Sequence, residues 1–165
     1  MEITRDIALN LVRPDAPAKA IVADNRLLTH PKSPHHTRHI ELDLQGTPLE
    51  GSFQAGQAIG IIPRLERRVE ENGVEIRSDD RTLRLYSISS PSAGEHGSGR
   101  LVGTPVKRVM TEHWETGKTF LGVCSNYLCD LEEGDEVEVT GPAGNQLLLP
   151  DHDEREHHRY LFLAA

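Results

Sequence analysis

Two stretches of the chain alternate apolar and polar residues with a period of two, which is typical of a half-buried β-strand. In TRHIELDL (37–44) one face carries Ile40, Leu42 and Leu44, and the other carries His39, Glu41 and Asp43. DEVEVTGP (135–142) repeats the pattern with Val137 and Val139 inward, until Gly141-Pro142 is expected to break the strand. Alternation of this kind favours an antiparallel sheet with one solvated face.

Three further stretches are predicted to be strands, and turn residues separate them. They are AIGIIP (58–63), RLYSISS (84–90) and RLVGTPVKRVM (100–110), the last with a bulge expected near Gly103 and Pro105. Between the first two, a polar stretch (64–81) with the turn signal Asn72-Gly73 predicts a solvated hairpin.

Only SNYLCDLEEGD (125–135) has a helical pattern. Ser125 can cap its start, Leu128 and Leu131 are three residues apart, and Gly134 can end it. With 14 Gly and 10 Pro among 165 residues, the many short strands and single helix predict a mainly β fold, a small antiparallel barrel.

The chain divides into four predicted parts. A lead-in (1–17) precedes the barrel (18–150), and the polar DHDEREHHR (151–159) is expected to be a linker. YLFLAA (160–165) is apolar on both faces, which is typical of a buried parallel strand. We therefore expect it to begin a second domain, whose remaining strands and helices are missing from the sequence.

The formal net charge is −8, which disfavours nucleic acid or an anionic membrane as the main partner. Aromatic residues make up only 4%, too few for the stacking platforms of an oligonucleotide-binding barrel. No apolar run approaches the roughly 20 residues of a membrane span, so no membrane insertion is expected. The charged N-terminus lacks a signal core, and we expect a cytoplasmic protein in which Cys124 and Cys129 are free thiols.

Arg84, Tyr86 and Ser87 place a cation, a ring and a hydroxyl close together on a predicted strand. Arg84 and Tyr86 should share one face, and Ser87 should point to the other. The planar guanidinium suits a phosphate, and the phenol ring can stack on a flat ligand. An exposed arginine and a half-buried tyrosine on an edge strand would explain the same residues without a ligand.

The segment GVCSNYLCDL (122–131) holds a second candidate site. Gly122 permits close backbone approach, and the start of the predicted helix at Ser125 would attract an anion. Cys124 lies there either as a small buried residue or as a contact to a bound ring or phosphate. No base is evident near it in the sequence, so a nucleophilic cysteine is not proposed.

The histidines of HPKSPHHTRH (30–39) and DHDEREHH (151–158) match no zinc spacing, so we expect solvated surface side chains and no metal. Six basic residues form either a solvated face balanced by nearby acids or a docking patch for an acidic protein. They are Arg64, Arg67, Arg68, Arg81, Lys107 and Arg108.

Four stretches, in this order, resemble the flavin domain of the plant-type ferredoxin–NADP⁺ reductase family: GQAIGIIP, RLYSISS, VKRVM and GVCSNYLCDLEEGDEVEVTGPAGNQLLLP. The resemblance extends from about Ala18 to the end. It implies an FR-type Greek-key β-barrel that binds FAD, with NADP(H) as co-substrate of the intact enzyme. NADPH would pass hydride to flavin N5, and single electrons would pass to or from ferredoxin or a similar acidic iron–sulfur or flavodoxin carrier.

The resemblance also implies individual roles. Arg84 would hold the FAD pyrophosphate, Tyr86 would stack on the flavin, and Leu85 between them would add backbone contacts. Ser87 would hydrogen-bond near N5, so Ser87 and Cys124 are the implied catalytic residues.

The remaining implied contacts lie later in the chain. Pro105, Val106 and Lys107 would pass the adenine half of FAD, and Lys107 would also meet the NADP phosphates. Gly122, Val123, Cys124 and Ser125 would wrap the pyrophosphate, with Cys124 near the nicotinamide pocket.

Two departures from the family pattern leave alternatives open. Thr111 stands where the family often has an adenine-stacking aromatic residue, and the NADP domain is expected to be missing. The reductase component of an aromatic-acid (acyl-CoA) epoxidase or oxygenase shares much of the pattern. An inactive, flavin-free barrel that serves only as a binding module is the other alternative.

Overall fold

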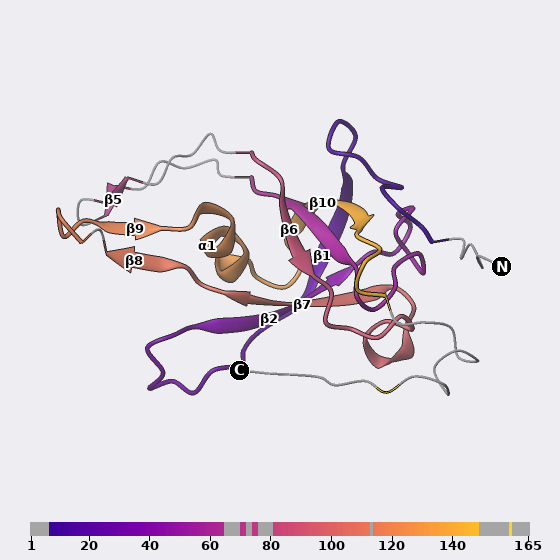
Figure 1. Cartoon of the computed structure of the whole chain (residues 1–165), viewed down its shortest axis with the longest axis horizontal. Coiled ribbons are helices and arrows are strands. Elements are labelled where there is room, and N and C mark those ends of the chain that lie inside the picture. The colour runs from indigo at the N-terminus through magenta and orange to yellow at the C-terminus, as the bar shows by residue number, and fades with distance from the viewer. Residues whose placement is uncertain are drawn as a thin grey trace.

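The computed structural model describes residues 7–64, 70–71, 74–75, 81–112, 114–148 and 159, with only the backbone for 70–71 and 74–75. Six antiparallel strands form the main sheet, in the order β6-β3-β10-β1-β2-β7 (Figure 1). These strands are β1 (Ala18–Leu27), β2 (Thr37–Asp43), β3 (Ala58–Ile62), β6 (Arg84–Ser87), β7 (Leu101–Lys107) and β10 (Glu136–Ala143).

The smaller elements extend from this sheet. β4 (Glu70–Glu71) pairs with β5 (Val74–Glu75), which confirms a hairpin in the predicted place, although Asn72 and Gly73 lie outside the described residues. β8 (Met110–Glu112) pairs with β9 (Thr119–Leu121) in a second hairpin. The described helices are the 3₁₀ turn η1 (Glu95–Gly97) and α1 (Val123–Asp130), and neither is long and apolar enough to cross a membrane.

The first and last strands of the sheet approach each other. The Ser89 amide donates to Gly103 O at 2.9 Å, and Thr104 Oγ1 donates to Ser87 O at 3.0 Å, so the end of β6 is bonded to β7. The predicted mainly β, antiparallel fold with one α-helix is therefore confirmed.

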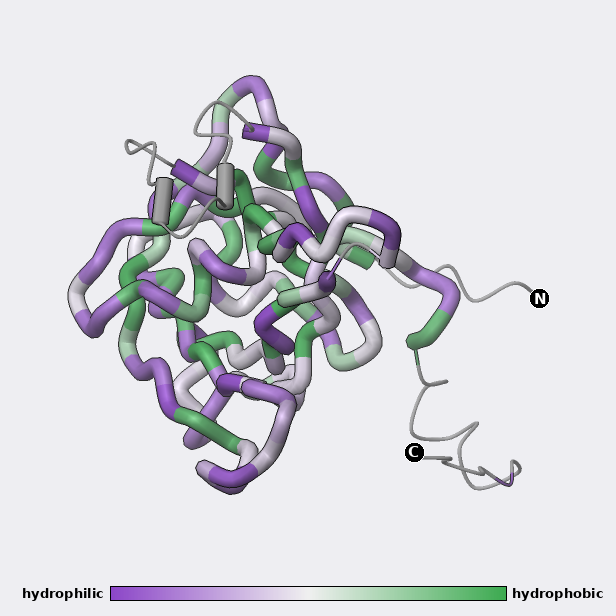
Figure 2. Tube along the Cα trace, turned by 90° about the vertical axis from the view of Figure 1, so that its left-hand side faces the viewer, coloured by the Kyte–Doolittle hydropathy of each residue, from purple (hydrophilic) through white to green (hydrophobic). Residues whose placement is uncertain are grey.

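The alternating positions fill the core as predicted. Ile40 and Leu42 of β2 and Val137 and Val139 of β10 are fully buried, and Leu128 of α1 is buried with them. In Figure 2 the hydrophilic segments gather at the outer turns, while hydrophobic segments cross the middle of the molecule. Burial of this apolar face stabilises the sheet by about 25 cal/mol for each Å² removed from water.

The helix differs from its prediction at both ends. It begins at Val123, two residues before Ser125, and the residue at its C-cap is Leu131 in an extended conformation. Asn25 of β1 bonds the C-terminal carbonyls instead, because its Nδ2 donates to Leu131 O at 2.7 Å and to Leu128 O at 3.1 Å. Gly134 lies beyond the helix in a turn with a φ of 94°, where glycine is favoured.

Two predicted irregularities of the strands were also wrong in detail. β7 pairs with β2 without a register shift, and no bulge forms at Gly103 or Pro105. Pro105 is tolerated because β7 is the last strand of the sheet, where a missing N–H breaks no ladder. β10 does not break at Gly141-Pro142 but continues to Ala143, with its register against β3 shifted between Thr140 and Ala143.

The predicted lead-in joins the core. Val12 is buried, its amide donates to Gly141 O at 3.0 Å, and it accepts from the Gly141 amide at 2.9 Å. Of the predicted linker (151–159) only Arg159 is described, and the predicted strand at 160–165 lies outside the described residues.

Candidate functional site

β6 is an edge strand that pairs with β3 alone among the described strands. Arg84 and Tyr86 are half-buried on one face, whereas Leu85 and Ser87 are exposed on the other, as the alternation predicts. Arg84 Nη1 donates to Thr82 O at 2.5 Å, which holds the guanidinium beside its own strand. Among the described residues, only the end of β6 is bonded to β7, so a ligand along the rest of this edge can reach side chains from both faces of β6.

The start of α1 is held by side chains of its first turn. Gly122 is the N-cap and provides no side-chain cap. The buried Ser125 hydroxyl does not cap the helix as predicted, because Oγ accepts from the Val109 amide at 3.1 Å and donates to Gly122 O at 3.3 Å. Asn126 Nδ2 donates to Gly122 O at 2.7 Å and to Val109 O at 3.0 Å. Any phosphate contact of Ser125 would therefore come from its backbone amide.

Gly122 is required where it stands. A Cβ at this position would lie 2.8 Å from Ser125 Oγ and 2.9 Å from Val109 Cβ, both too close for a larger residue. An open pocket of about 210 Å³ runs along one side of α1, from its start to its end. Its lining comprises Leu121, Gly122, Val123, Asn126, Tyr127, Asp130 and Leu131.

Tyr86 and Cys124 join β6 to α1. The Tyr86 hydroxyl hydrogen-bonds with the Cys124 thiol, and the Cys124 side chain is buried. Burial raises the pKa of Tyr86 strongly, the bond to Cys124 raises it further, and the charge of Arg84 opposes this shift. Tyr86 is therefore neutral at physiological pH, and Arg84 lies on the same face of β6 as Tyr86. Both cysteines are free thiols, as predicted.

The end of β7 contributes alternately to the core and to the surface. Val106 is 1% exposed and packs in the core, while Pro105 and Lys107 are exposed on the outer face. Arg108 ties this strand to α1, because its Nη1 donates to Asn126 Oδ1 at 2.9 Å and its other nitrogen pairs with Asp130. The bond to Asp130 is the main reason that the pKa of Arg108 is raised.

The β8–β9 hairpin exposes aromatic surface next to the helix start. Thr111 lies directly opposite Phe120, so the two side chains share one face of the hairpin. Phe120 is 63% exposed, and Trp114 in the connecting turn is 87% exposed.

No protein-family model matches the chain. Curated relatives do match it: the chain is 38% identical over 149 residues to a ferredoxin–NADP reductase of Thermosynechococcus vestitus, covering 90% of this chain and 36% of the relative. It is 36% identical over 149 residues to that of a Spirulina species, covering 90% of this chain and 47% of the relative. The chain is homologous to the ferredoxin–NADP reductases.

This reductase homologue spans less than half the length of the curated relatives. Plant sequences match similarly: the embryo isozyme of the Oryza sativa chloroplast ferredoxin–NADP reductase is 35% identical over 161 residues, 96% of this chain and 40% of that protein. The solved ferredoxin–NADP⁺ reductase of Plasmodium falciparum superposes with a TM-score of 0.67 at 24% identity, over 93% of this chain and 49% of that one. That likeness confirms the fold.

The basic residues of the reductase homologue are largely paired with acids where the structure describes them. Arg64 Nη2 lies 2.8 Å from Glu138 Oε1, and Arg81 pairs with the other oxygen of Glu138. Arg67 and Arg68 lie outside the described residues. These pairs agree with a solvated, charge-balanced face.

The prediction of solvated histidines is wrong for His39. This side chain is on the outer face of β2, as expected, but it is buried together with Glu41 because η1 and the segment around it cover that face. Glu95 of η1 was not singled out from the sequence, since an isolated glutamate in a Gly-rich turn carries no signal of its own.

Proposed function

We propose that this chain is the FAD-binding part of a ferredoxin–NADP⁺ reductase-type flavoprotein, which exchanges hydride with NADP(H) and single electrons with an iron–sulfur protein. The observation that carries the proposal is the meeting of β6 and the start of α1 through Tyr86 and Cys124. A cation, a neutral phenol and the amides of a helix start then surround one edge of the sheet, in a chain homologous to the reductases.

The donor set fits a dinucleotide with a charged middle and flat ends. The diphosphate of FAD needs a guanidinium and amide donors, which Arg84 and the first turn of α1 provide. Its ring systems need exposed apolar or aromatic faces, which Tyr86, Leu85 and Phe120 provide. Bound FAD would supply the conversion between a two-electron hydride and single electrons.

The chain's own residues would orient the cofactor. Arg84 would bind the diphosphate together with the amides of Val123, Cys124 and Ser125, and Gly122 lets the backbone turn tightly into the helix. Tyr86 would donate its hydroxyl and present its ring, and the buried Cys124 would hold that hydroxyl in place.

The exposed residues would act at the two ends. Ser87 would hydrogen-bond at the reacting edge of the flavin, and Leu85 would shield one side of it from water. Pro105 and Lys107 would lie along the adenine half, with Lys107 as the cation for a phosphate, while Val106 supports them from the core. An acidic ferredoxin-like carrier would dock near Lys107 by charge attraction.

Titration of the purified, flavin-free chain with FAD tests the proposal. We expect one FAD per chain, with a perturbed visible spectrum and quenched flavin fluorescence, because the flavin moves from water to a protein surface. Bovine serum albumin at the same concentration serves as the control for nonspecific uptake. A chain that stays colourless after FAD is added and excess removed by gel filtration would contradict the proposal.

Phe120→Ala is expected to weaken FAD binding about tenfold, because loss of one base–aromatic stacking contact costs roughly 1–3 kcal/mol. Phe120 lies opposite Thr111, where the family often has its adenine-stacking residue, and would replace it. FMN, which lacks adenine, should bind wild type and variant equally, and Phe120→Tyr should restore FAD affinity. Equal loss for FAD and FMN would mean that Phe120 does not contact adenine.

A further inference from the structure

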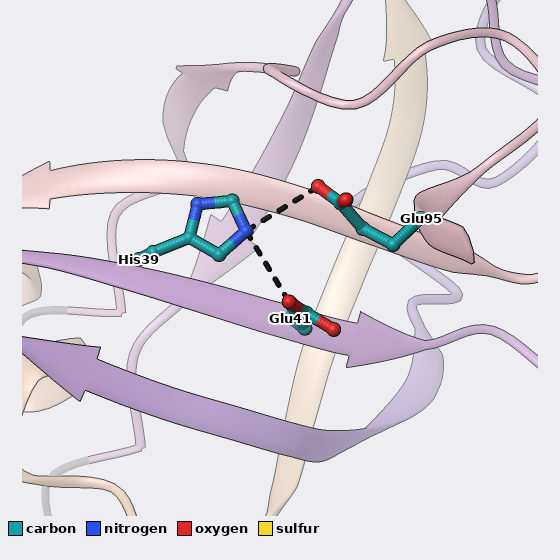
Figure 3. A group of neighbouring side chains, drawn as sticks. All are labelled: His39, Glu41 and Glu95. Atoms are coloured by element: carbon teal, nitrogen blue, oxygen red, sulfur yellow. Dashed lines mark ion pairs between the residues drawn. The ribbon is translucent and has the colours of Figure 1, made fainter.

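Three ionisable side chains converge on the outer face of β2 (Figure 3). His39 Nε2 lies 3.3 Å from Glu95 Oε1 and 3.5 Å from Glu41 Oε1, and the ligand atoms of the three residues all lie within 4.8 Å of one another. His39 and Glu41 are two residues apart on β2 and so share a face, while Glu95 reaches them from η1.

The cluster is buried, and one of its polar atoms has no hydrogen-bond partner. The side chains of His39, Glu41 and Glu95 are 11%, 5% and 19% exposed. Among the described residues, His39 Nε2 is the one buried side-chain nitrogen or oxygen without a hydrogen bond. The carboxylate oxygens of Glu95 and Glu41 lie farther from Nε2 than the about 2.7–2.9 Å of a charge-assisted N–H···O bond, and neither forms a hydrogen bond with it.

The two distances from the histidine to the carboxylates match those between neighbouring ligands of a zinc ion. Zinc binds histidine nitrogen at about 2.0–2.1 Å and carboxylate oxygen at about 2.0–2.2 Å, which places neighbouring ligand atoms of a tetrahedron roughly 3.3–3.5 Å apart. The distances from His39 Nε2 to the two carboxylates are 3.3 and 3.5 Å. Three protein ligands leave the fourth position for water, or for His96, whose Nε2 lies 3.8 Å from Glu41 Oε2.

The neighbours keep this space open and negatively charged. Gly103 of β7 lies opposite Glu41, and a Cβ there would lie 2.3 Å from Glu95 Oε1 and 2.7 Å from His39 Cε1. Arg26 Nη1 donates to Glu41 Oε1 at 2.6 Å and also pairs with Asp24, so it does not neutralise Glu95. Two carboxylates against one shared guanidinium leave room for a further cation.

We propose that His39, Glu41 and Glu95 bind a divalent transition-metal ion of the zinc type. The ion would fasten η1 to β2 and β7 on the outer face of the sheet. This site is separate from the proposed FAD site, because its ligands come from β2 and η1 and none comes from β6 or α1.

Zinc titration of the chelator-treated chain, followed by calorimetry and thermal unfolding, tests this site. We expect one Zn²⁺ per chain and a higher unfolding temperature with the metal, because a ligand of the native state alone stabilises it. Glu95→Gln keeps the shape of the side chain but removes a charged ligand, and should weaken Zn²⁺ binding at least tenfold and abolish the thermal shift. Co²⁺ in place of Zn²⁺ should give the intense visible absorption of tetrahedral coordination.

A matched control removes two neighbouring histidines, His35 and His36. His35→Gln/His36→Gln should leave zinc affinity unchanged, since neither of these described histidines belongs to the cluster. His39→Gln should lose binding like Glu95→Gln, with thermal unfolding of the metal-free variants as a check that each is folded. The proposal is overturned if wild type binds no stoichiometric Zn²⁺, if Glu95→Gln binds it like wild type, or if His35→Gln/His36→Gln removes binding.

Discussion

Arg84→Ala is expected to weaken FAD binding by the purified chain by about 10- to 150-fold, with little loss of fold stability. A hydrogen bond to a charged group contributes roughly 1.5–3 kcal/mol, and the diphosphate would lose its guanidinium partner. Arg84 is half-buried on an edge strand, and the sheet ladder is made by backbone groups that the substitution retains, so its removal leaves the ladder intact. Flavin fluorescence titration measures the affinity, and thermal unfolding without FAD measures the stability.

Two variants sharpen that result. Arg100 directly precedes β7 and pairs with Asp43. The Arg100→Ala variant should bind FAD like wild type. Arg84→Lys keeps the charge but loses the planar fork, and should recover only part of the affinity. If Arg84→Ala and wild type retain equal flavin absorbance per protein, Arg84 does not hold the diphosphate.

Leu128→Ala is expected to destabilise the fold by about 2–5 kcal/mol, because it leaves a cavity that the surrounding strands can fill only partly. Leu128 is completely buried, and it is the α1 residue that packs most deeply into the core. Chemical denaturation gives the free energy of unfolding. Since α1 supplies part of the proposed diphosphate site, FAD affinity should fall as well.

Leu147→Ala is the matched control, since Leu147 is 79% exposed. It should change the free energy of unfolding by less than about 0.5 kcal/mol. A Leu128→Ala variant as stable as this control would mean that α1 is not an integral part of the core.

The faces of the strands could be predicted from the sequence, but the cover over them could not. Alternation places Ile40 and Leu42 inward, and both are fully buried. It also places His39 and Glu41 on the outer face of the sheet, where both side chains are predicted to be exposed to solvent. They are buried because the segment with η1, more than fifty residues later in the chain, lies over that face.

The start of the helix was misplaced for a similar reason. Serine is a good N-cap, so Ser125 predicts the first residue of a helix. Its hydroxyl instead bonds the Val109 amide, a partner sixteen residues away that local propensity does not include. Gly122 then takes the N-cap position, and the helix begins two residues before Ser125.

Predicting the candidate site required both the family resemblance and the pairing of the strands in the folded structure. Alternation predicted the faces of Arg84, Tyr86 and Ser87, but only the fold brings Tyr86 to Cys124. Phe120 was missed because its relation to Thr111 depends on the pairing of β8 with β9. Pairing the residues on either side of the turn between those two strands, outward from its centre, could have identified Phe120 as the partner of Thr111.

The strand order has a consequence for how the molecule assembles. β10 is the last of the described strands along the chain, yet it lies between β3 and β1 and joins the two halves of the sheet. Until residues 136–143 have left the ribosome, β3 and β1 each have one unpaired edge, and the sheet has no continuous core. Pairing of Ala18 with Val139 brings together residues far apart in the chain, and such non-local closure slows folding. Nascent chains that stop short of Ala143 would therefore depend on chaperones, which cover exposed strand edges.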